Sequence, residues 1–355
     1  MVFRECSISR SEEISMMDKN NDITDVLVSI IIPIYNVEKY IGDCIRSIAG
    51  QTLQEFEVIL VDDESKDTSV SIAEALLRQL SISFLTIHQK NQGQGVARNN
   101  GIAAATGEYV VCVDPDDTIA PDYLESLYMV CKKENLDVSF CAFRYVKESN
   151  RHQYERFNGE YCIYSRKTLL NLFLKNTGFI ALPATMIKKS FIGANNISAP
   201  HGCRYSEDDY FLWKMFFFAS SVGFVSKPLY NYYMHEKSTS TTFDTERILS
   251  GHFSFCELTE YLLTLNVEKE IVPYILPRVV LGHLRSIAQM CDYNDFYTTA
   301  AAMDYKENML KLKSFPEWKV RKLAMLIRVS PYIFYSLVRV AHRLYMKKVS
   351  TADRK

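Results

Sequence analysis

Short apolar runs alternate with helical patterns through the first half of the chain. The runs are rich in β-branched residues and have the length of buried strands. Between them, apolar residues recur every three or four positions, as on one face of a helix. This alternation predicts a parallel, doubly wound α/β sheet. The predicted strands lie at 26–34, 57–61, 83–88 and 108–113.

Two of these predicted strands end in carboxylates. Asp62 and Asp63 follow the second run, and Asp114, Asp116 and Asp117 follow the fourth. Because the carboxyl ends of parallel strands meet at one edge of a sheet, where such sheets bind ligands, we expect a ligand site there. Carboxylates this close repel one another unless a cation or hydrogen-bond donors balance them, and Mg²⁺ or Mn²⁺ prefers oxygen ligands. The alternative is a solvated Asp/Pro turn before a helix.

Residues 90–101, just before the fourth strand, contain Gly93, Gly95 and Arg98. They do not complete a dinucleotide fingerprint, because Arg98 occupies the position of the third glycine and the segment does not open the first βα unit. The chain has no P-loop motif either. An arginine at a helix start beside an acidic edge can bind the diphosphate of a nucleotide or neutralise the acids. A salt bridge at the helix start is the alternative interpretation.

Composition narrows the class of protein. The chain has 355 residues, 48% of them hydrophobic, so it can bury a substantial core, and its net charge of −1 argues against nucleic acid as a partner. Its nine cysteines include no C-x-x-C pair, which predicts reduced, mostly buried thiols in a cytoplasmic protein. No uninterrupted apolar stretch predicts a transmembrane helix, and residues 1–26 form a polar leader without a signal-peptide core.

A second acidic cluster opens a helical pattern further along the chain. Glu207, Asp208 and Asp209 follow Ser206 and precede apolar residues at helical spacing. Ser206-x-x-Asp209 resembles a capping box, and the helix dipole favours acids in a first turn. From these residues alone, a cap and a catalytic acid are equally good interpretations.

The last third of the chain is predicted to be helical in two parts. Residues 244–315 show packed-helix spacing and no candidate chemistry, whereas 316–355 form a basic amphipathic tail. Between Trp318 and Lys348, Lys and Arg interleave with apolar and aromatic residues, and no acid occurs. Basic amphipathic helices of this kind lie on anionic membrane surfaces. The alternative is a helix packed on the rest of the protein with a solvated basic face.

Taken in order, these motifs resemble those of the family-2 glycosyltransferases. The resemblance covers roughly 27–243 and implies the nucleotide-sugar-binding GT-A fold, a mostly parallel twisted sheet flanked by helices, followed by a helical extension. One departure is Glu64, which stands where the family commonly has glycine. The matching segments are 28–36, 51–52, 61–67, 91–93, 97–101, 105–109 and 114–117.

The resemblance implies roles in binding a nucleotide sugar. Pro33, Tyr35 and Glu38 would line the nucleoside pocket, with Tyr35 near the base. Asp63 would accept a hydrogen bond from the base N–H, and Asp114 would lie near the ribose and the diphosphate.

The resemblance also implies a metal ligand and a base. Asp116, the second acid of the Asp-x-Asp motif, would bind the divalent cation. Asp208 would be the catalytic base, although the consecutive acids leave Glu207 and Asp209 open as alternatives.

The implied enzyme is an inverting glycosyltransferase that uses a nucleotide-diphosphate donor, expected to be a UDP-sugar, and a saccharide acceptor. With the basic tail, we expect a lipid-linked acceptor, cell-surface polysaccharide synthesis, and a cytoplasmic enzyme on the inner face of the plasma membrane. One alternative is a nucleotidyltransferase, although that class carries a Gly-rich basic loop where this chain has residues 33–36. Another is a catalytically inactive, membrane-docked assembly subunit.

Overall fold

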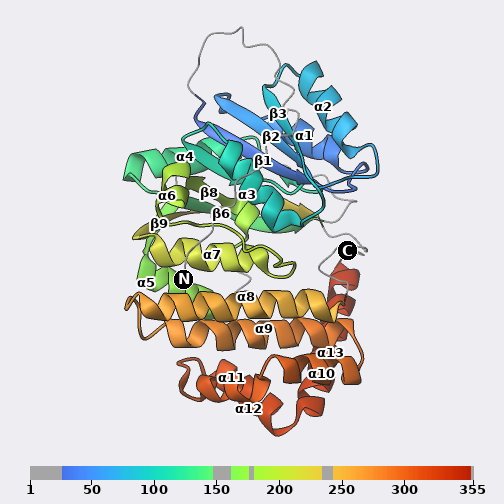
Figure 1. Ribbon diagram of the computed structural model, residues 1–355, viewed down its shortest axis with the longest axis vertical. Coiled ribbons are helices and arrows are strands. Elements are labelled where there is room, and N and C mark those ends of the chain that lie inside the picture. Colours follow the sequence, from blue (N-terminus) through green and yellow to red (C-terminus); the bar gives the residue numbers. More distant parts are fainter. Residues whose placement is uncertain (1–25, 147–160, 176–179, 234–242, 353–355) are drawn as a thin grey trace, which may run out of the picture.

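The structure is a computed structural model that describes residues 26–146, 161–175, 180–233 and 243–352, with side chains described as far as Leu344 (Figure 1). The predicted polar leader lies outside these residues except for its last position. In the described part of the chain the cysteines are free thiols, and most of them are buried, as the sequence predicts.

Four parallel strands form the first half of the sheet, in the order β3-β2-β1-β4. Helices α1 and α2 pack on one face, and α3 packs against β1 and β2 on the other. Every residue of β1 is buried, which explains its continuous apolar run. The predicted doubly wound pattern is therefore confirmed. The bounds are β1 (Val28–Ile34), α1 (Ile41–Ala49), β2 (Phe56–Asp62), α2 (Ser69–Gln79), β3 (Phe84–His88), α3 (Gln94–Ala104) and β4 (Tyr109–Cys112).

The second half of the sheet is mixed. β8 lies antiparallel between β4 and β6, β9 runs parallel to β6, and β5 and β7 pair with β9 in antiparallel fashion. This half carries α7, which lies across the sheet on its lower side in Figure 1. The bounds are β5 (Thr118–Ile119), α4 (Tyr123–Glu134), β6 (Val138–Val146), β7 (Tyr161–Ser165), α5 (Arg166–Lys175), β8 (Thr185–Lys188), α6 (Lys189–Ala194), α7 (Glu207–Phe218) and β9 (Ser221–Tyr233).

The C-terminal third is helical, as predicted, and forms layers below α7 (Figure 1). One hydrophobic core runs without interruption from Ile31 of β1 through Trp213 of α7 to Ile287 of α9 and Ile327 of α12. The helical extension is therefore packed directly against the part that carries the sheet. The bounds are α8 (Thr245–Thr264), α9 (Ile275–Met290), α10 (Tyr293–Ala302), α11 (Tyr305–Lys311), α12 (Trp318–Val329) and α13 (Pro331–Ala352).

The last two helices carry apolar residues on the side that packs on the protein and also on the exposed side. Val320, Ala324, Ile327 and Phe334 are buried in the core, so α12 and the start of α13 pack on the protein. Other large apolar residues of the same helices are exposed. In the described part of the chain, no helix is long and apolar enough to cross a membrane. The exposed residues are Trp318, Met325, Val329, Tyr332, Ile333, Leu337, Val340 and Leu344.

Candidate active site

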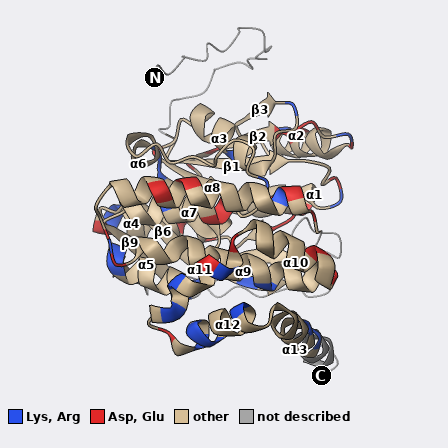
Figure 2. Cartoon of the chain, turned by 60° about the horizontal axis from the view of Figure 1, so that its bottom comes forward, with Lys and Arg blue, Asp and Glu red and all other residues tan. Residues whose placement is uncertain are grey.

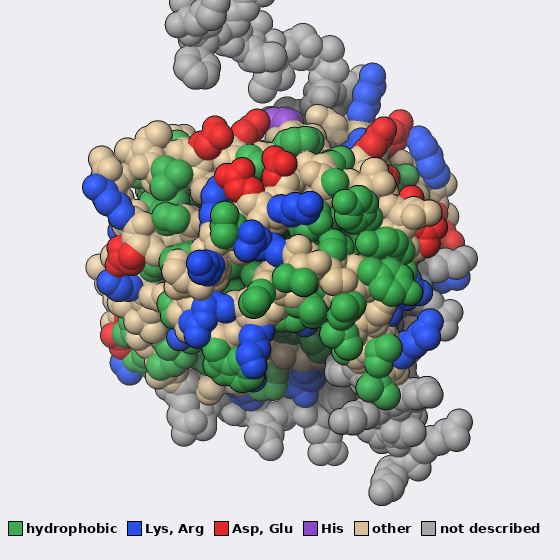
Figure 3. Space-filling view, turned by 90° about the horizontal axis from the view of Figure 1, so that it is seen from below, with side chains coloured by type: hydrophobic (Ala, Val, Ile, Leu, Met, Phe, Trp, Pro, Cys, Tyr) green, Lys and Arg blue, Asp and Glu red, His purple; other side chains and the backbone are tan. Residues whose placement is uncertain are grey.

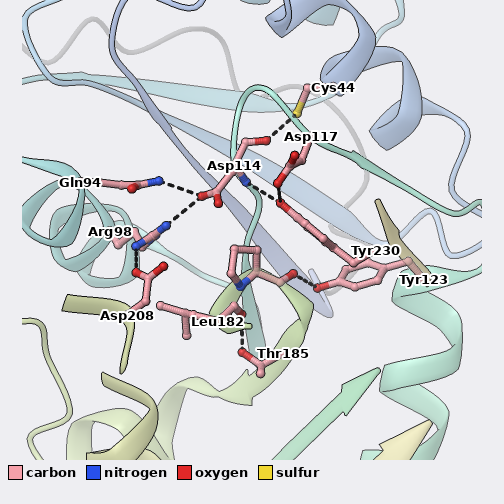
Figure 4. Close-up of polar contacts among 11 residues, drawn as sticks. Cys44, Gln94, Arg98, Asp114, Asp117, Tyr123, Leu182, Thr185, Asp208 and Tyr230 are labelled. Atoms are coloured by element: carbon pink, nitrogen blue, oxygen red, sulfur yellow. Dashed lines mark hydrogen bonds and ion pairs between the residues drawn. The ribbon is translucent and has the colours of Figure 1, made fainter. Parts of the chain in front are cut away.

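Arg98 joins two acids that come from distant parts of the chain (Figure 4). Its Nη2 lies 2.8 Å from Asp114 Oδ1, and its Nη1 donates to Asp208 Oδ1. The Arg98 side chain is only 2% exposed. Burial lowers the pKa of Arg98, but Asp208 and Asp114 outweigh burial and raise that pKa above its ordinary value. The structure therefore brings the predicted strand-edge acid and the predicted base into one site.

Two glycines allow α3 to carry Arg98 to this position. Gly93 precedes the helix with φ of 90°, a conformation that residues with a Cβ rarely adopt. Gly95, in the first turn, lies against Ala199 and the start of α7, so that an added Cβ would be 2.9 Å from Ala199 Cβ and 3.2 Å from Glu207 Cγ. A larger residue would push α3 away from α7. The backbone conformation at Gly93 and the close approach at Gly95 therefore explain both glycines, and no bound dinucleotide is needed to account for them.

The loop after β4 is held in place by hydrogen bonds. Asp114 Oδ1 accepts from Gln94 Nε2 at 2.8 Å, and the Asp114 N–H donates to the Tyr230 hydroxyl at 3.2 Å. That hydroxyl donates to Asp117 Oδ2 at 2.7 Å, and the Tyr233 N–H donates to Asp117 Oδ1 at 2.7 Å. Asp117 therefore fixes the shape of the acidic loop.

The carboxylates of this loop repel one another. Burial, followed by Asp114 and Asp116, raises the pKa of Asp117 to about 9, although Tyr230 and Tyr233 donate hydrogen bonds that lower it. A cation bound at the loop would reduce this repulsion.

Asp114 and Asp116 are the candidate metal ligands. Among the described residues, no group of three or more His, Cys, Asp or Glu side chains could hold a metal ion by itself. Mg²⁺ at nucleotide sites binds one or two carboxylates and completes its coordination with phosphate oxygens and water. The oxygen donors of this loop therefore fit a cation that is shared with a diphosphate, and they do not fit a metal site made of protein alone.

Asp63 lies immediately after β2 and anchors the turn that leads into α3. It is 3% exposed. Its Oδ1 accepts from Gln89 Nε2 and the Gln92 N–H, both at 2.8 Å, and its Oδ2 accepts from the Gly93 N–H at 2.9 Å. These bonds hold Gly93 in the position from which α3 begins. The predicted hydrogen bond from a nucleobase stays a prediction.

The three predicted residues of the nucleoside pocket lie at the same sheet edge. Pro33 is buried in β1, and Tyr35, just past that strand, is 50% exposed. Glu38 is exposed, and its Oε2 accepts from the Thr68 hydroxyl at 2.9 Å and from the Thr68 N–H at 3.2 Å. Glu38 thereby ties the segment after β1 to the start of α2.

Asp208 has the electrostatic setting of a base that works near neutral pH. It lies in the first turn of α7, and its side chain is 37% exposed. Burial raises its pKa, Arg98 lowers it, and Glu207, Asp114 and Asp209 raise it again, so that its pKa is about 7. Burial and Glu207 also raise the pKa of Asp209 to about 7. The ion pair with Arg98 favours Asp208 over Glu207 and Asp209 as the candidate base.

Two residues of the site were not among the sequence predictions. Gln94 stands between Gly93 and Gly95, and Tyr230 lies in the apolar pattern of β9. Neither residue type at such a position indicates chemistry, because Gln94 and Tyr230 reach Asp114 only through the tertiary packing.

Sequence comparisons show that this chain is similar to glycosyltransferases. Residues 29–194 match the family described as Glycosyl transferase family 2. EpsH of Bacillus subtilis (strain 168), a protein named as a glycosyltransferase, is 33% identical over 63% of this chain and 65% of its own length. Glycosyltransferase GlyG of Streptococcus pneumoniae serotype 4 is 27% identical over 81% of this chain and 96% of its own length.

The fold also has a counterpart among solved structures. The structure of residues 1–349 of S. aureus TarS in complex with UDP-GlcNAc has a TM-score of 0.69 and 21% identity. The similarity covers 90% of this chain and 92% of that one. The predicted α/β fold with a helical C-terminal region is thereby confirmed, and residues 29–194 match the predicted family.

Proposed function

Since residues 29–194 of this chain are a family-2 glycosyltransferase domain, we propose that the protein is an inverting glycosyltransferase. It transfers a sugar from a nucleotide-diphosphate donor, a UDP-sugar, to a hydroxyl of a saccharide acceptor. The choice of uridine is supported by the UDP-GlcNAc bound to TarS, whose fold this chain shares. The proposed acceptor is a lipid-linked saccharide in cell-surface polysaccharide synthesis.

One observation carries the proposal: the buried Arg98 connects Asp114 at the strand edge with Asp208 at the start of α7. Transfer requires a site for the donor diphosphate and a base within reach of the acceptor hydroxyl. The sheet edge that ends in Asp63 and Asp114 offers the first, and Asp208 offers the second. The predicted contact of Arg98 with the donor is part of this proposal.

In this mechanism Asp208 accepts the proton of the acceptor hydroxyl as the hydroxyl oxygen attacks the anomeric carbon. The bond from that carbon to the diphosphate oxygen breaks, and the electron pair leaves with the nucleoside diphosphate. A single in-line displacement inverts the configuration. Arg98 holds Asp208 in position through their ion pair, and its charge opposes protonation of the base before the acceptor binds.

Asp116, together with Asp114, would hold a divalent cation, Mg²⁺ or Mn²⁺. When bound, such an ion offsets the negative charge that develops on the leaving diphosphate. Gln94 and Tyr230 keep the loop that carries both acids in one conformation, so the carboxylates are already oriented before a donor arrives.

A screen of nucleotide sugars tests the proposal. UDP-GlcNAc, UDP-glucose, UDP-galactose and GDP-mannose are each added with and without Mn²⁺, and thermal stabilisation and slow release of the nucleotide are measured. We expect at least one UDP-sugar to raise the melting temperature and to release UDP only when Mn²⁺ is present. Stabilisation by UTP with a sugar phosphate, and formation of a nucleotide sugar from them, would contradict the proposal.

We further propose that α12 and α13 dock the enzyme on an anionic lipid surface. Figure 2 shows blue Lys and Arg but no red Asp or Glu on these helices. In Figure 3, which views the molecule from the end where α12 lies in Figure 1, green apolar side chains intermingle with blue basic ones. Exposed apolar residues such as Met325 (66% exposed) and Val329 (75%) stand beside the exposed Arg328. Apolar insertion together with basic charge is what anionic bilayers bind.

A further inference from the structure

The segment immediately before α7 is held by two helices of the C-terminal extension. The Arg204 N–H donates to Ser250 Oγ of α8 at 3.0 Å. The Tyr205 ring contacts both the Arg247 guanidinium of α8, 5.5 Å from the ring centroid, and the His283 ring of α9, with ring centroids 5.0 Å apart. These contacts, made two and three residues before the acidic cluster, connect the extension to the start of the helix that carries Asp208.

Ser206, the last residue before α7, makes the most direct of these contacts. It adopts φ of 58°, which is uncommon for a residue with a Cβ, and its Oγ lies 3.0 Å from Nε2 of His283. His283 is 5% exposed, and its Nδ1 has no hydrogen-bond partner among the described residues. A buried ring nitrogen without a hydrogen bond costs free energy. The hydrogen bond with Ser206 spares Nε2 of His283 this cost.

Close backbone packing reinforces the contact. At Gly251 of α8, an added Cβ would lie 2.2 Å from the Tyr205 carbonyl oxygen and 3.1 Å from its carbonyl carbon. Only glycine at this position lets α8 lie against the Tyr205 backbone. At Gly282, next to His283 in α9, an added Cβ would have no atom within 4 Å. The two glycines therefore form a matched pair for experiment.

We propose that α8 and α9 position the catalytic base. Gly251, Ser206 and His283 act as positioning residues that set the first turn of α7, so that Asp208 meets Arg98 and the acceptor hydroxyl. The inference rests on the proposed role of Asp208. Because a misplacement of about 1 Å can lower a rate by about 100-fold, small shifts of this turn have large effects on turnover. Through Gly251 and His283 the helical extension thereby supports the position of Asp208, although it lies outside the matched family domain at 29–194.

Gly251→Ala and Gly282→Ala test the packing. Both substitutions add one methyl group inside a helix, so their effects on helix propensity are matched. The readout is UDP release from UDP-GlcNAc with Mn²⁺, or from whichever UDP-sugar the screen selects. We expect Gly251→Ala to lower kcat at least tenfold with a donor KM within twofold of wild type, and Gly282→Ala to leave both constants unchanged. Equal kcat values for the two variants would overturn the inference.

A double-mutant cycle tests the hydrogen bond. We expect Ser206→Ala and His283→Leu each to lower kcat severalfold, and the double variant to lose no more than the larger single effect, because the two changes remove one contact. His283→Gln, whose amide nitrogen can replace Nε2, should restore part of the loss. If the losses in kcat were fully additive, or if donor KM rose to the same extent, these residues would act on general stability and the positioning role would be rejected. This cycle also decides the question if Gly251→Ala does not fold.

Hydrogen exchange provides a readout that needs no turnover. In Ser206→Ala and Gly251→Ala, amides of residues 203–210 should exchange at least tenfold faster, while those of β1 and β4 keep their wild-type rates. Uniformly faster exchange would indicate global destabilisation and contradict a positioning role. Failure of the proposed function gives a different result. If Asp208→Asn turns over normally, the base is elsewhere and the proposed function is wrong. If Asp208→Asn is inactive while the positioning variants are fully active, only this inference is rejected.

Discussion

At the scale of single residues, the ion pairs of Arg98 determine how the site is assembled. Asp114 and Asp208 lie 16 and 110 positions away from Arg98 in the chain, and the buried guanidinium holds both. A buried charge needs such partners, because an unpaired one costs several kcal/mol. The same pairs orient Asp208 and help to set its pKa. Three predictions belong to this scale.

Asp208→Asn should retain donor binding and lose transfer by about 100-fold or more, the usual contribution of a general base. The amide has the shape of the carboxylate but cannot accept the proton. Calorimetric titration with UDP and Mn²⁺ measures binding, and UDP release measures turnover. Glu207→Gln is the neighbouring control, for which we expect a smaller loss. Normal turnover of Asp208→Asn would show that another group is the base.

The pH dependence of kcat/KM should have an acidic limb with a midpoint of about 7, because Asp208 must be deprotonated to act and its pKa is raised to about 7. Activity therefore falls as the pH drops below 7 and levels off above it. Initial rates of UDP release between pH 5 and 9 check this expectation. A limb near the ordinary pKa of an aspartate, about 4, would contradict the assigned environment.

Asp116→Ala should abolish the dependence of donor binding on Mn²⁺, because it removes a proposed ligand of the cation. UDP titrations with Mn²⁺ and with EDTA give the ratio of affinities, which we expect to be large for the wild type and close to one for the variant. Asp43→Ala, which removes an exposed carboxylate of α1 that pairs with Arg46, is the control. An unchanged ratio in Asp116→Ala would remove Asp116 from the metal site.

At the scale of elements, α3 places the site between the sheet and the helices. Asn99 exchanges two hydrogen bonds with the Ala199 backbone, at 2.8 and 3.0 Å, and thereby ties α3 to the segment that precedes α7. On its other side, Gly101 lies against β1 and β2, where an added Cβ would be 2.4 Å from Ile31 Cγ2. The helix can occupy this narrow space because Gly95 and Gly101 stand at its closest contacts on the two sides.

Gly101→Ala should lower the free energy of unfolding by about 1–3 kcal/mol, the usual cost of overpacking a close contact. Urea denaturation followed by circular dichroism measures the change. Gly193→Ala in α6 is the matched control, because an added Cβ there meets no atom within 4 Å. We expect the control to be neutral or to gain up to about 1 kcal/mol through the stiffer unfolded chain. Equal stability of the two variants would mean that α3 can shift without cost.

At the scale of the whole molecule, one core connects the sheet, α7 and the helical extension. This continuity lets α8 and α9 influence the start of α7, and it also supports α12, at the far end of the molecule from α2, and the start of α13 (Figure 1). The proposed transfer to a lipid-linked saccharide would gain from such a platform, because the proposed docking would hold the enzyme near its acceptor.

Lys322→Glu with Arg328→Glu should weaken binding to anionic vesicles by about 30-fold or more, since each basic residue near a membrane contributes about 1 kcal/mol. Co-sedimentation with vesicles of phosphatidylglycerol and phosphatidylcholine, at low and high salt, measures the affinity. Arg78→Glu on α2 is the control charge reversal and should bind like wild type. Equal binding of the wild type to pure phosphatidylcholine vesicles, or no binding at all, would reject the docking proposal.

Local patterns in the sequence determined much of this protein. Continuous apolar runs and helical spacing predicted the doubly wound half of the sheet, because both patterns are properties of neighbouring residues. The acids after the strands were predictable as neighbours for a related reason, since parallel strands bring their carboxyl ends to one edge. Asp63 and Asp114 lie at that edge. The basic character of α12 and α13 is likewise visible in the sequence alone.

Tertiary structure alone decided how these pieces meet. The antiparallel insertion of β8 between β4 and β6, the link from Arg98 to Asp208, and the bond from Tyr230 to Asp117 across 113 positions have no local signal. The same holds for Ser206 and His283, which are 77 positions apart. Such contacts depend on how helices and strands pack against one another, and packing is set by the whole set of buried surfaces rather than by neighbours in the chain.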